Sequence, residues 1–480
     1  MAGEKMLKFT GLARVMPDKR EASSRKGDFH EIYGEFIAAK AEAQASRCSQ
    51  CGVPFCQVHC PLHNNIPDWL KLTAEGRLEE AYELSSATNN MPEICGRICP
   101  QDRLCEGNCV IEQSGHGTVT IGAVEKYITE TAWTKGWVKP VAAGKPTGRS
   151  VGIIGAGPAG LAAAEELRRK GHEVHVYDRY DRAGGLLIYG IPNFKLEKDV
   201  VQRRTRRLEA AGIHFHRNAE IGRTHAFADL RSRHDAMLIA TGVYKARALD
   251  LPGSNLPQIV PAMRYLTASN RAGLGDAVPD LANGLLDAGG KRVVVIGGGD
   301  TAMDCVRTAV RQGASSVSCL YRRDRANMPG SLREVANAEE EGVEFIWLSA
   351  PREIMGKGKV EAVRAHRMRL GLADASMRQT PEEVPNSDFT LAADLVIEAL
   401  GFEPEDATAM FGMEALALSP SGTIKADPRS KETTLPGVYA AGDIVRGASL
   451  VVWAIRDGRD AARAIDKALA RQSAAKLAAE

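Results

Sequence analysis

The stretch from Val151 to Asp178 constrains the fold more than any other part of this 480-residue chain. It reads VGIIGAGPAGLAAAEELRRKGHEVHVYD: an apolar run, the pattern Gly-x-Gly-x-x-Gly, a helical segment, and a second apolar run that ends at an acid. A glycine-rich turn between a strand and a helix, with an acid roughly 20 residues later, predicts a dinucleotide-binding βαβ unit. A turn that binds nothing is the ordinary alternative, and the agreement of the neighbouring elements argues against it.

The residues of this turn have separate predicted tasks. Gly155 permits the tight turn, Gly157 lets the backbone approach a pyrophosphate, and Gly160 lets the helix pack closely on the strand. The N-terminus of the helix presents free N–H groups to the phosphates. Asp178 is expected to hold ribose hydroxyls.

The segment Lys291–Asp324 repeats the order of strand, glycine-rich turn, helix and strand. Its turn contains Gly297 and Gly299, but its second strand ends at Arg322 and Arg323 instead of an acid. A carboxylate there would repel a 2′-phosphate, whereas a guanidinium binds a phosphate through two parallel hydrogen bonds. The second unit is therefore predicted to bind NADPH rather than NADH, with two solvated surface arginines as the ordinary alternative.

Eight of the ten cysteines fall in two runs, Cys48-x2-Cys51-x4-Cys56-x3-Cys60-Pro61 and Cys95-x3-Cys99-Pro100-x4-Cys105-x3-Cys109. Three interpretations compete. Disulfides need an oxidising compartment, and zinc sites usually show paired Cys-x2-Cys spacings. Compact runs of four thiolates with a proline after the last cysteine favour two [4Fe–4S] clusters, and ligands can be exchanged between the runs. A helix expected over Ile66–Ser86 would pack the two runs together.

Composition narrows the class of protein. With 44% hydrophobic residues, 25% charged residues and a net charge of +2, the chain is typical of globular proteins and predicts no binding to nucleic acid. The N-terminus lacks the apolar segment of a signal peptide and no stretch is long enough to span a membrane, so a cytoplasmic protein is expected. The histidines are scattered, and His172, His175, His214 and His216 are expected on a βαβ surface without forming a metal site.

Three motifs together resemble the flavoprotein reductases with two dinucleotide-binding units, in which the first unit binds FAD and the second NAD(P)H. They are GIIGAGPAGLAAAEEL, VVVIGGGDTAMD followed by LYRRD, and VYAAGDIVRG. The cysteine runs and the segment YGIPNFKL at Tyr189–Leu196 are specific to a smaller group of proteins. They resemble the small (beta) subunits of bacterial NADPH-dependent glutamate synthase and the related N-terminal half of dihydropyrimidine dehydrogenase, over essentially the whole chain.

The resemblance implies an α/β fold of two Rossmann-like domains, the second inserted in the first, preceded by a helical iron–sulfur domain. Its expected boundaries are 1–145 for the cluster domain, 146–288 and 402–480 for the FAD-binding domain, and 289–401 for the NADPH-binding domain. The FAD contacts implied are Gly155, Gly157, Pro158, Ala159, Gly160, Asp178, Arg179, Gly185, Leu186, Thr241, Gly242, Gly442 and Asp443. The NADPH contacts implied are Gly297, Gly299, Asp300, Thr301, Ala302, Arg322 and Arg323.

The resemblance also assigns the cysteines to two separate clusters. One [4Fe–4S] cluster would use Cys48, Cys51, Cys56 and Cys109. The other would use Cys60, Cys99 and Cys105, with a side-chain oxygen from the helix after the second run as its fourth ligand. In dihydropyrimidine dehydrogenase that ligand is a glutamine. Here the matching region contains Glu125, and Cys95 competes with it.

The function implied is electron input to glutamate synthase. A hydride passes from NADPH to FAD, and single electrons leave through the clusters to a large (alpha) subunit with FMN and an iron–sulfur cluster. That subunit makes L-glutamate from L-glutamine and 2-oxoglutarate, so a hetero-oligomer is expected, and this chain positions cofactors without a general base. The alternatives are a reductase subunit of a ferredoxin:NADP or pyrimidine-reducing system, and a flavin and iron–sulfur redox sensor.

Overall fold

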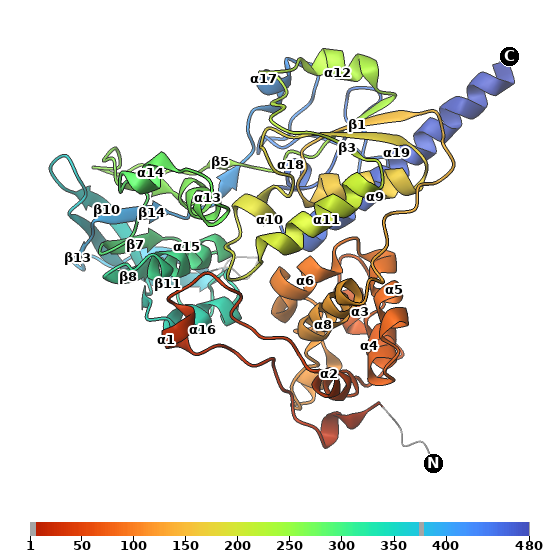
Figure 1. Ribbon diagram of the computed structural model, residues 1–480. Coiled ribbons are helices and arrows are strands. Elements are labelled where there is room, and N and C mark those ends of the chain that lie inside the picture. The colour runs from red at the N-terminus through yellow and green to blue at the C-terminus, as the bar shows by residue number, and fades with distance from the viewer. Residues whose placement is uncertain (1–5, 374–378, 480) are drawn as a thin grey trace.

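The computed structural model describes residues 6–373 and 379–479, and its secondary structure falls into three regions (Figure 1). A helical region near the N-terminus, orange in the figure, lies below a first sheet region, and a second sheet region in green and cyan lies beside both. The C-terminal helix α19, Val451–Ala479, packs on the first sheet region and extends beyond it. Among the described residues, no helix is long and apolar enough to cross a membrane.

The helical region packs around a core that includes the fully buried side chains of Trp69, Ile94 and Ile128. The single helix expected over 66–86 is instead two helices, because Gly76 takes a left-handed conformation with φ +76° and turns the chain. The elements are η1 Lys8–Thr10, α1 Ala22–Arg25, α2 Ala38–Ala45, α3 Phe55–Val58, α4 Ile66–Ala74, α5 Leu78–Thr88, α6 Pro92–Ile98, η2 Gln101–Arg103, α7 Val110–Gln113 and α8 Ile121–Thr134.

The first sheet has the strand order β16-β4-β1-β2-β3, and all of its pairings are parallel. Its strands are β1 Ser150–Ile154, β2 Glu173–Tyr177, β3 His214–His216, β4 Ala236–Ile239 and β16 Val438–Ala440. Its helices are α9 Pro158–Arg169, α10 Leu186–Tyr189, α11 Lys198–Ala210, α12 Phe227–Arg233, α17 Ala407–Phe411 and α18 Asp443–Arg446. The last strand of this sheet lies about 200 residues after β4 in the chain, which confirms the predicted insertion.

The second sheet, with order β6-β14-β7-β8-β9, is also parallel and fills that gap. Its strands are β6 Ile259–Pro261, β7 Arg292–Ile296, β8 Ser316–Leu320, β9 Glu344–Ile346 and β14 Leu395–Glu398, with helices α13 Ala262–Gly273, α14 Pro279–Ala282, α15 Asp300–Arg311 and α16 Leu332–Glu340. The strand β6 lies before position 289, so the second sheet starts earlier in the chain than the boundary that we expected. This strand has only three residues and no glycine-rich turn after it.

Two smaller sets of strands complete the fold. An antiparallel sheet is formed by β10 Ser349–Met355, β11 Ala362–Ala373, β12 Gln379–Glu383 and β13 Phe389–Ala392. The pair β5 Lys245–Ala246 and β15 Phe402–Glu403 joins the two segments that connect the parallel sheets. The crossing between the domains is thus a pair of antiparallel segments.

The segment Tyr189–Leu196 docks the first dinucleotide domain onto the second. The Phe194 ring lies under two guanidinium groups of α15, 4.5 Å from Arg307 and 3.9 Å from Arg311. The Lys195 ammonium lies 2.8 Å from the Asp304 carboxylate of the same helix. Cation–π contacts and a buried ion pair therefore hold this motif in place.

A buried ionic network attaches the N-terminal segment to the second sheet region. The Glu341 carboxylate accepts hydrogen bonds from Arg307 (2.8 Å), Arg311 (2.7 Å) and Arg25 of α1 (2.9 Å). Burial opposes ionisation of Glu341, but the hydrogen bonds from Arg311 and Arg307 outweigh it and lower its pKa to about 2. Removing this charge would leave Arg311 without a charged partner, while Arg307 would keep Glu334 and Arg25 would keep Glu340.

We therefore expect Glu341→Gln to destabilise the folded protein by about 3 kcal/mol at pH 7. Because the pKa of Glu341 is lower in the folded state, its contribution to stability is complete above the unfolded value of about 4.5. It is lost as the pH falls toward 2. Calorimetric melting of wild type and variant from pH 7 to pH 3 measures this, and the difference between the two melting temperatures should shrink as the pH falls below about 4.5.

The matched control is Glu339→Gln, near the end of α16 and two residues before Glu341, where an exposed ion pair with Arg325 (2.6 Å) is removed. An exposed pair contributes about 0–1 kcal/mol, so this variant should melt close to wild type at every pH. Equal destabilisation by the two substitutions would contradict the special role of Glu341.

Candidate functional site

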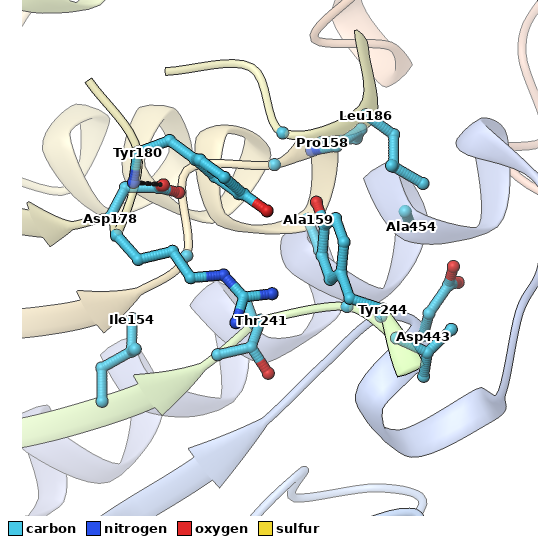
Figure 2. A pocket seen from close by; sticks show the side chains of 18 of the residues that line it. Ile154, Pro158, Ala159, Asp178, Tyr180, Leu186, Thr241, Tyr244, Asp443 and Ala454 are labelled. Atoms are coloured by element: carbon cyan, nitrogen blue, oxygen red, sulfur yellow. Dashed lines mark hydrogen bonds between the residues drawn. The ribbon is translucent and has the colours of Figure 1, made fainter. Parts of the chain in front are cut away.

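A cavity of about 1180 Å³, including its open mouth, lies at the carboxyl ends of β1, β2 and β4 (Figure 2). Ligands bind at this edge of parallel sheets because loops and helix N-termini converge there. All contacts implied for the first unit line the cavity except Gly160. They are Gly155, Gly157, Pro158, Ala159, Asp178, Arg179, Gly185, Leu186, Thr241, Gly242, Gly442 and Asp443.

The three glycines of the first turn have the distinct environments that the pattern predicts. Gly155 has φ +107°, and a Cβ there would lie 2.4 Å from the carbonyl oxygen of Ala240. A Cβ on Gly160 would lie 1.9 Å from the carbonyl oxygen of Gly155, so this glycine serves the packing behind the cavity. A Cβ on Gly157 would meet no atom within 4 Å, which leaves its backbone open to a ligand.

Asp178 has a structural task that the sequence did not reveal. Its buried carboxylate accepts the backbone N–H of Ala156 at 2.6 Å and that of Tyr180 at 2.8 Å. Burial raises the pKa of this carboxyl group, and the backbone hydrogen bonds act in the opposite direction. Asp178 therefore holds the glycine-rich turn against the end of β2 while lining the cavity.

Arg179, an expected contact, pairs with two groups that sequence reasoning missed. The Arg179 guanidinium lies 2.9 Å from the Glu405 carboxylate and 4.8 Å from the centre of the Tyr244 ring. The rings of Tyr180 and Tyr244 both lie beside the cavity in Figure 2. Tyr244 follows β4 by five residues, so its position depended on knowing where that strand ends.

Two further polar groups that line the cavity, those of Thr241 and Asp443, differ in their hydrogen bonding. The buried hydroxyl of Thr241 has no hydrogen-bond partner among the described residues. The Asp443 carboxylate accepts the Ser449 hydroxyl at 2.6 Å, and this side chain is among those that line the cavity in Figure 2. Buried polar groups are normally paired, so the Thr241 hydroxyl indicates a missing partner inside the cavity.

The second turn reproduces the first. Gly297 has φ +146°, and a Cβ there would lie 2.3 Å from the carbonyl oxygen of Ala399, as Gly155 does against Ala240. A Cβ on Gly299 would meet nothing within 4 Å, as on Gly157. Asp300 opens α15 and its carboxylate accepts the backbone N–H of Ser331 at 2.8 Å. Thr301 and Ala302 follow in the first turn of this helix.

The two arginines after β8 are free of carboxylates. Neither Arg322 nor Arg323 forms an ion pair with another of the residues that the structure describes. Arg322 is exposed, and Arg323 is half-buried with its Nε unpaired in the described part of the chain. Both guanidinium groups are therefore available to an anionic ligand.

The eight clustered cysteines separate into two sets in space. A cavity of about 390 Å³ is lined by Cys60, Cys95, Cys99, Cys105 and Glu125. The remaining thiols, Cys48, Cys51, Cys56 and Cys109, interact with one another. Burial raises the pKa of Cys56 to about 12, and the nearby Cys48, Cys109 and Cys51 raise it as well.

Both candidates for the fourth ligand of the second set face the same cavity. The Glu125 carboxylate accepts long hydrogen bonds of 3.4 Å from Ser85 and from Asn89, and burial raises its pKa to about 8. Cys95 is buried one helical turn before Cys99. Gln101 also lines this cavity and donates to the carbonyl oxygen of Cys95 at 2.8 Å, a contact that sequence reasoning missed.

One turn of α19 contributes to the lining of both cavities. Val452 lines the cysteine cavity, while its neighbours Val451 and Ala454 line the larger one. Arg456 on the same helix donates to the carbonyl oxygen of Pro61, directly after Cys60, at 3.0 Å. The start of α19 thus contacts both sites.

Two of the histidines lie close to a carboxylate on the first sheet. Glu173, His175 and His214 place one possible metal ligand atom each within 4.8 Å of one another. His172 lies apart, with its ring 3.1 Å from Asp466. The grouping was missed because its members come from two strands that are separated by about 40 residues in sequence.

Comparisons with known proteins agree with this arrangement. Residues 25–137 match the family model described as dihydropyrimidine dehydrogenase domain II, 4Fe-4S cluster. Residues 149–458 match pyridine nucleotide-disulphide oxidoreductase. The fold of the dinucleotide domains is shared with Mycobacterium tuberculosis FprA in complex with NADPH, with a TM-score of 0.56 and 21% identity over 69% of this chain and 86% of that chain.

Relatives cover nearly the whole chain. It is 66% identical over 465 residues to the glutamate synthase (NADPH) small chain of Azospirillum brasilense, covering 97% of this chain and 96% of the relative. It is 46% identical over 469 residues to the protein of the same name from Escherichia coli (strain K12), covering 96% and 98%. The chain therefore belongs to the family of glutamate synthase (NADPH) small chains.

Proposed function

We propose that this chain is the electron-input subunit of a glutamate synthase. It oxidises NADPH and passes the electrons to a large subunit with FMN and an iron–sulfur cluster, which forms L-glutamate from L-glutamine and 2-oxoglutarate. The observation that carries the proposal is that one turn of α19 lines both the dinucleotide cavity and the cysteine cavity. The two subunits form a hetero-oligomer in the cytoplasm. This compartment is reducing, which agrees with ten cysteines that form no disulfide.

The larger cavity fits FAD. The open face of Gly157, the unpaired Thr241 hydroxyl and the aromatic wall of Tyr180 and Tyr244 suit a pyrophosphate, a polar ring edge and stacked rings, respectively. When bound, FAD supplies the ability to take up a hydride and to release electrons one at a time. The residues of this chain hold and orient it, and none is assigned as an acid or a base.

The second turn fits NADPH. Gly297 permits the tight turn against Ala399, and Gly299 leaves the backbone open at the N-terminus of the 12-residue helix α15, which favours a pyrophosphate. Arg322 and Arg323 supply the positive charge that a 2′-phosphate requires. This anchoring of the nucleotide supports discrimination between NADPH and NADH.

The cysteine sets fit two [4Fe–4S] clusters. Four thiols, Cys48, Cys51, Cys56 and Cys109, complete the first set. The second set takes Cys60, Cys99 and Cys105, with Glu125 or Cys95 as the fourth ligand. In each set thiols from both runs converge, as ferredoxin-like ligand exchange predicts.

The exposure of the two sets supports a direction for the electrons. In the second set Cys95, Cys99 and Cys105 are buried and Cys60 is partly buried. In the first set Cys48 and Cys109 are buried, and Cys51 and Cys56 are partly buried. Next to the latter, the apolar side chains of Val53, Phe55 and Val58 are 62%, 43% and 53% exposed. A partner that covers these side chains would meet the first set, so the second set receives electrons and the first delivers them.

The paired glycines provide a matched test of the two nucleotide sites. Gly157→Ala places a methyl group in the space assigned to the FAD pyrophosphate, so bound FAD should fall by about tenfold, equivalent to about 1.4 kcal/mol of binding energy. Gly299→Ala makes the same change in the second unit and should raise the KM for NADPH by about tenfold with normal FAD content. FAD content by absorbance and steady-state kinetics measure these effects, and exchanged phenotypes would contradict the assignment.

The activity itself is tested with the chain purified without oxygen and carrying its flavin and clusters. Rapid reduction of an artificial dye by NADPH is expected, since a dye accepts electrons without the large subunit. A redox sensor would reduce the dye only slowly, and that outcome would overturn the proposal. A ferredoxin-linked or pyrimidine-reducing system would instead show efficient transfer to ferredoxin or a pyrimidine.

A further inference from the structure

A polar patch on the first sheet has no part in the proposed electron path. Glu173 and His175 lie two residues apart on β2, and His214 and His216 lie two residues apart on β3. Side chains two apart on a strand share a face, and the register pairs His175 with His214 and Tyr177 with His216. Three imidazoles and one carboxylate are therefore collected on one face of the sheet.

The contacts within this patch are close. The His175 ring stacks on that of His214 with centroids 4.8 Å apart. One nitrogen of His175 lies 3.0 Å from a Glu173 carboxylate oxygen, and the other lies 3.0 Å from His216 Nε2. Glu173 and His214 are exposed and His175 is half-buried, so the group can be reached from solvent.

We propose that Glu173, His175 and His214 form a binding site for a transition-metal ion of the zinc class. One ligand atom from each lies within 4.8 Å of the others, and small rotations of exposed side chains would bring them to coordination distance. Two imidazoles and one carboxylate make up a donor set of open zinc sites, with water at the fourth position. Magnesium and calcium prefer all-oxygen ligands and are disfavoured here.

The surroundings of His175 support this assignment over a solvated strand face. A ligating histidine usually has its second ring nitrogen held by a hydrogen bond, and His216 occupies that position on His175. His216 is in turn stacked on Tyr177, 4.4 Å between centroids. These outer contacts fix the orientation of the His175 ring before an ion arrives.

His234 supports the site without being a ligand. Both of its ring nitrogens are occupied, one by the Ser150 hydroxyl at 2.7 Å and one by the Tyr177 hydroxyl at 3.0 Å. Its ring lies 5.1 Å from that of His175 and occupies space left by Gly152, where a Cβ would lie 2.6 Å from it. The ring thus closes the inner side of the patch.

The position of the site indicates how a bound ion would affect the stability of the sheet. The strand β3 has three residues and lies at the edge of the sheet, paired only with β2. An ion held by Glu173 and His175 on β2 and by His214 on β3 would tie this edge to the sheet. The strands β2 and β3 also lead to the larger cavity. Asp178, which lines that cavity, follows β2 directly, and its backbone N–H donates to the carbonyl oxygen of His216 at the end of β3. Zn²⁺ is therefore expected to raise the melting temperature of the flavin-binding region.

The test is calorimetric titration of Zn²⁺ into the complete, flavin- and cluster-loaded chain. We expect one zinc ion per chain at this site, with binding at least tenfold weaker in His214→Ala and unchanged in His30→Ala. The His30 side chain is 76% exposed and lies on the N-terminal segment. Unchanged FAD content would show that the His214→Ala variant is folded.

X-ray absorption at the zinc edge separates this site from the cysteines. Nitrogen and oxygen ligands lie at about 2.0–2.2 Å from zinc and thiolate sulfur at about 2.3 Å. A shell of nitrogen and oxygen that is lost in His214→Ala supports the proposal. A sulfur shell, or equal zinc binding by wild type, His214→Ala and His30→Ala, would overturn it.

Discussion

Replacing Arg322 and Arg323 together with alanine should raise the KM for NADPH by about 100-fold and leave the KM for NADH within about twofold. A hydrogen bond to a charged group contributes about 1.5–3 kcal/mol, and a loss of about 3 kcal/mol corresponds to about 100-fold in affinity. Both guanidinium groups follow β8 and are not engaged by a carboxylate of the described residues. Their charge is therefore free for a 2′-phosphate, the group that distinguishes NADPH from NADH.

Arg325→Ala is the matched control for this pair. It removes a third arginine from the same loop, but this side chain already forms an ion pair with Glu339. Steady-state kinetics with both nucleotides should show wild-type selectivity for Arg325→Ala. An equal rise in KM for NADPH and NADH in the double variant would remove the assigned role in binding the 2′-phosphate.

Replacing Cys99 with alanine should lower NADPH-dependent glutamate formation by the two-subunit enzyme at least about 1000-fold. Cys99 lines the cysteine cavity together with Val452 of α19, the helix whose Val451 and Ala454 line the larger cavity. Without this ligand the second cluster should not assemble, and iron content should fall by about half, from two [4Fe–4S] clusters to one. Reduction of an artificial dye by NADPH should remain within about twofold of wild type.

Cys305→Ala is the control for Cys99→Ala. Cys305 is equally buried but lies in the core of the second sheet region, outside both sets. Its loss should leave iron content and glutamate formation intact. Full iron content in Cys99→Ala would contradict the ligand assignment. Loss of dye reduction in that variant would show that the substitution damages the dinucleotide domains.

The sequence predicted features that depend on neighbouring residues. Each glycine-rich turn required a strand, a turn and a helix within about thirty residues, and Gly155, Gly157 and Gly160 have the separate environments that the pattern indicates. The same local reasoning failed at Gly76, where a helical pattern of apolar residues continued across a left-handed turn. Periodicity reports which side is buried, but not where one glycine reverses the chain.

Features that depend on distant residues were harder to predict. The separation of the cysteines into two sets came from a family resemblance, because two runs 35 residues apart can meet in several ways. Tyr244 and the β6 strand acquire their places only once β4 and β14 are paired with their neighbours. The patch at Glu173 and His175 was missed for the same reason, because its third member, His214, joins it through strand pairing.

The central claim is that this chain supplies electrons but makes no glutamate alone. The most direct test measures glutamate formed from glutamine, 2-oxoglutarate and NADPH by the purified chain, by the purified large subunit, and by their mixture. We expect glutamate only in the mixture, although the chain alone oxidises NADPH with a dye. Glutamate formation by the chain alone, or none in the mixture while dye reduction is rapid, would contradict the claim.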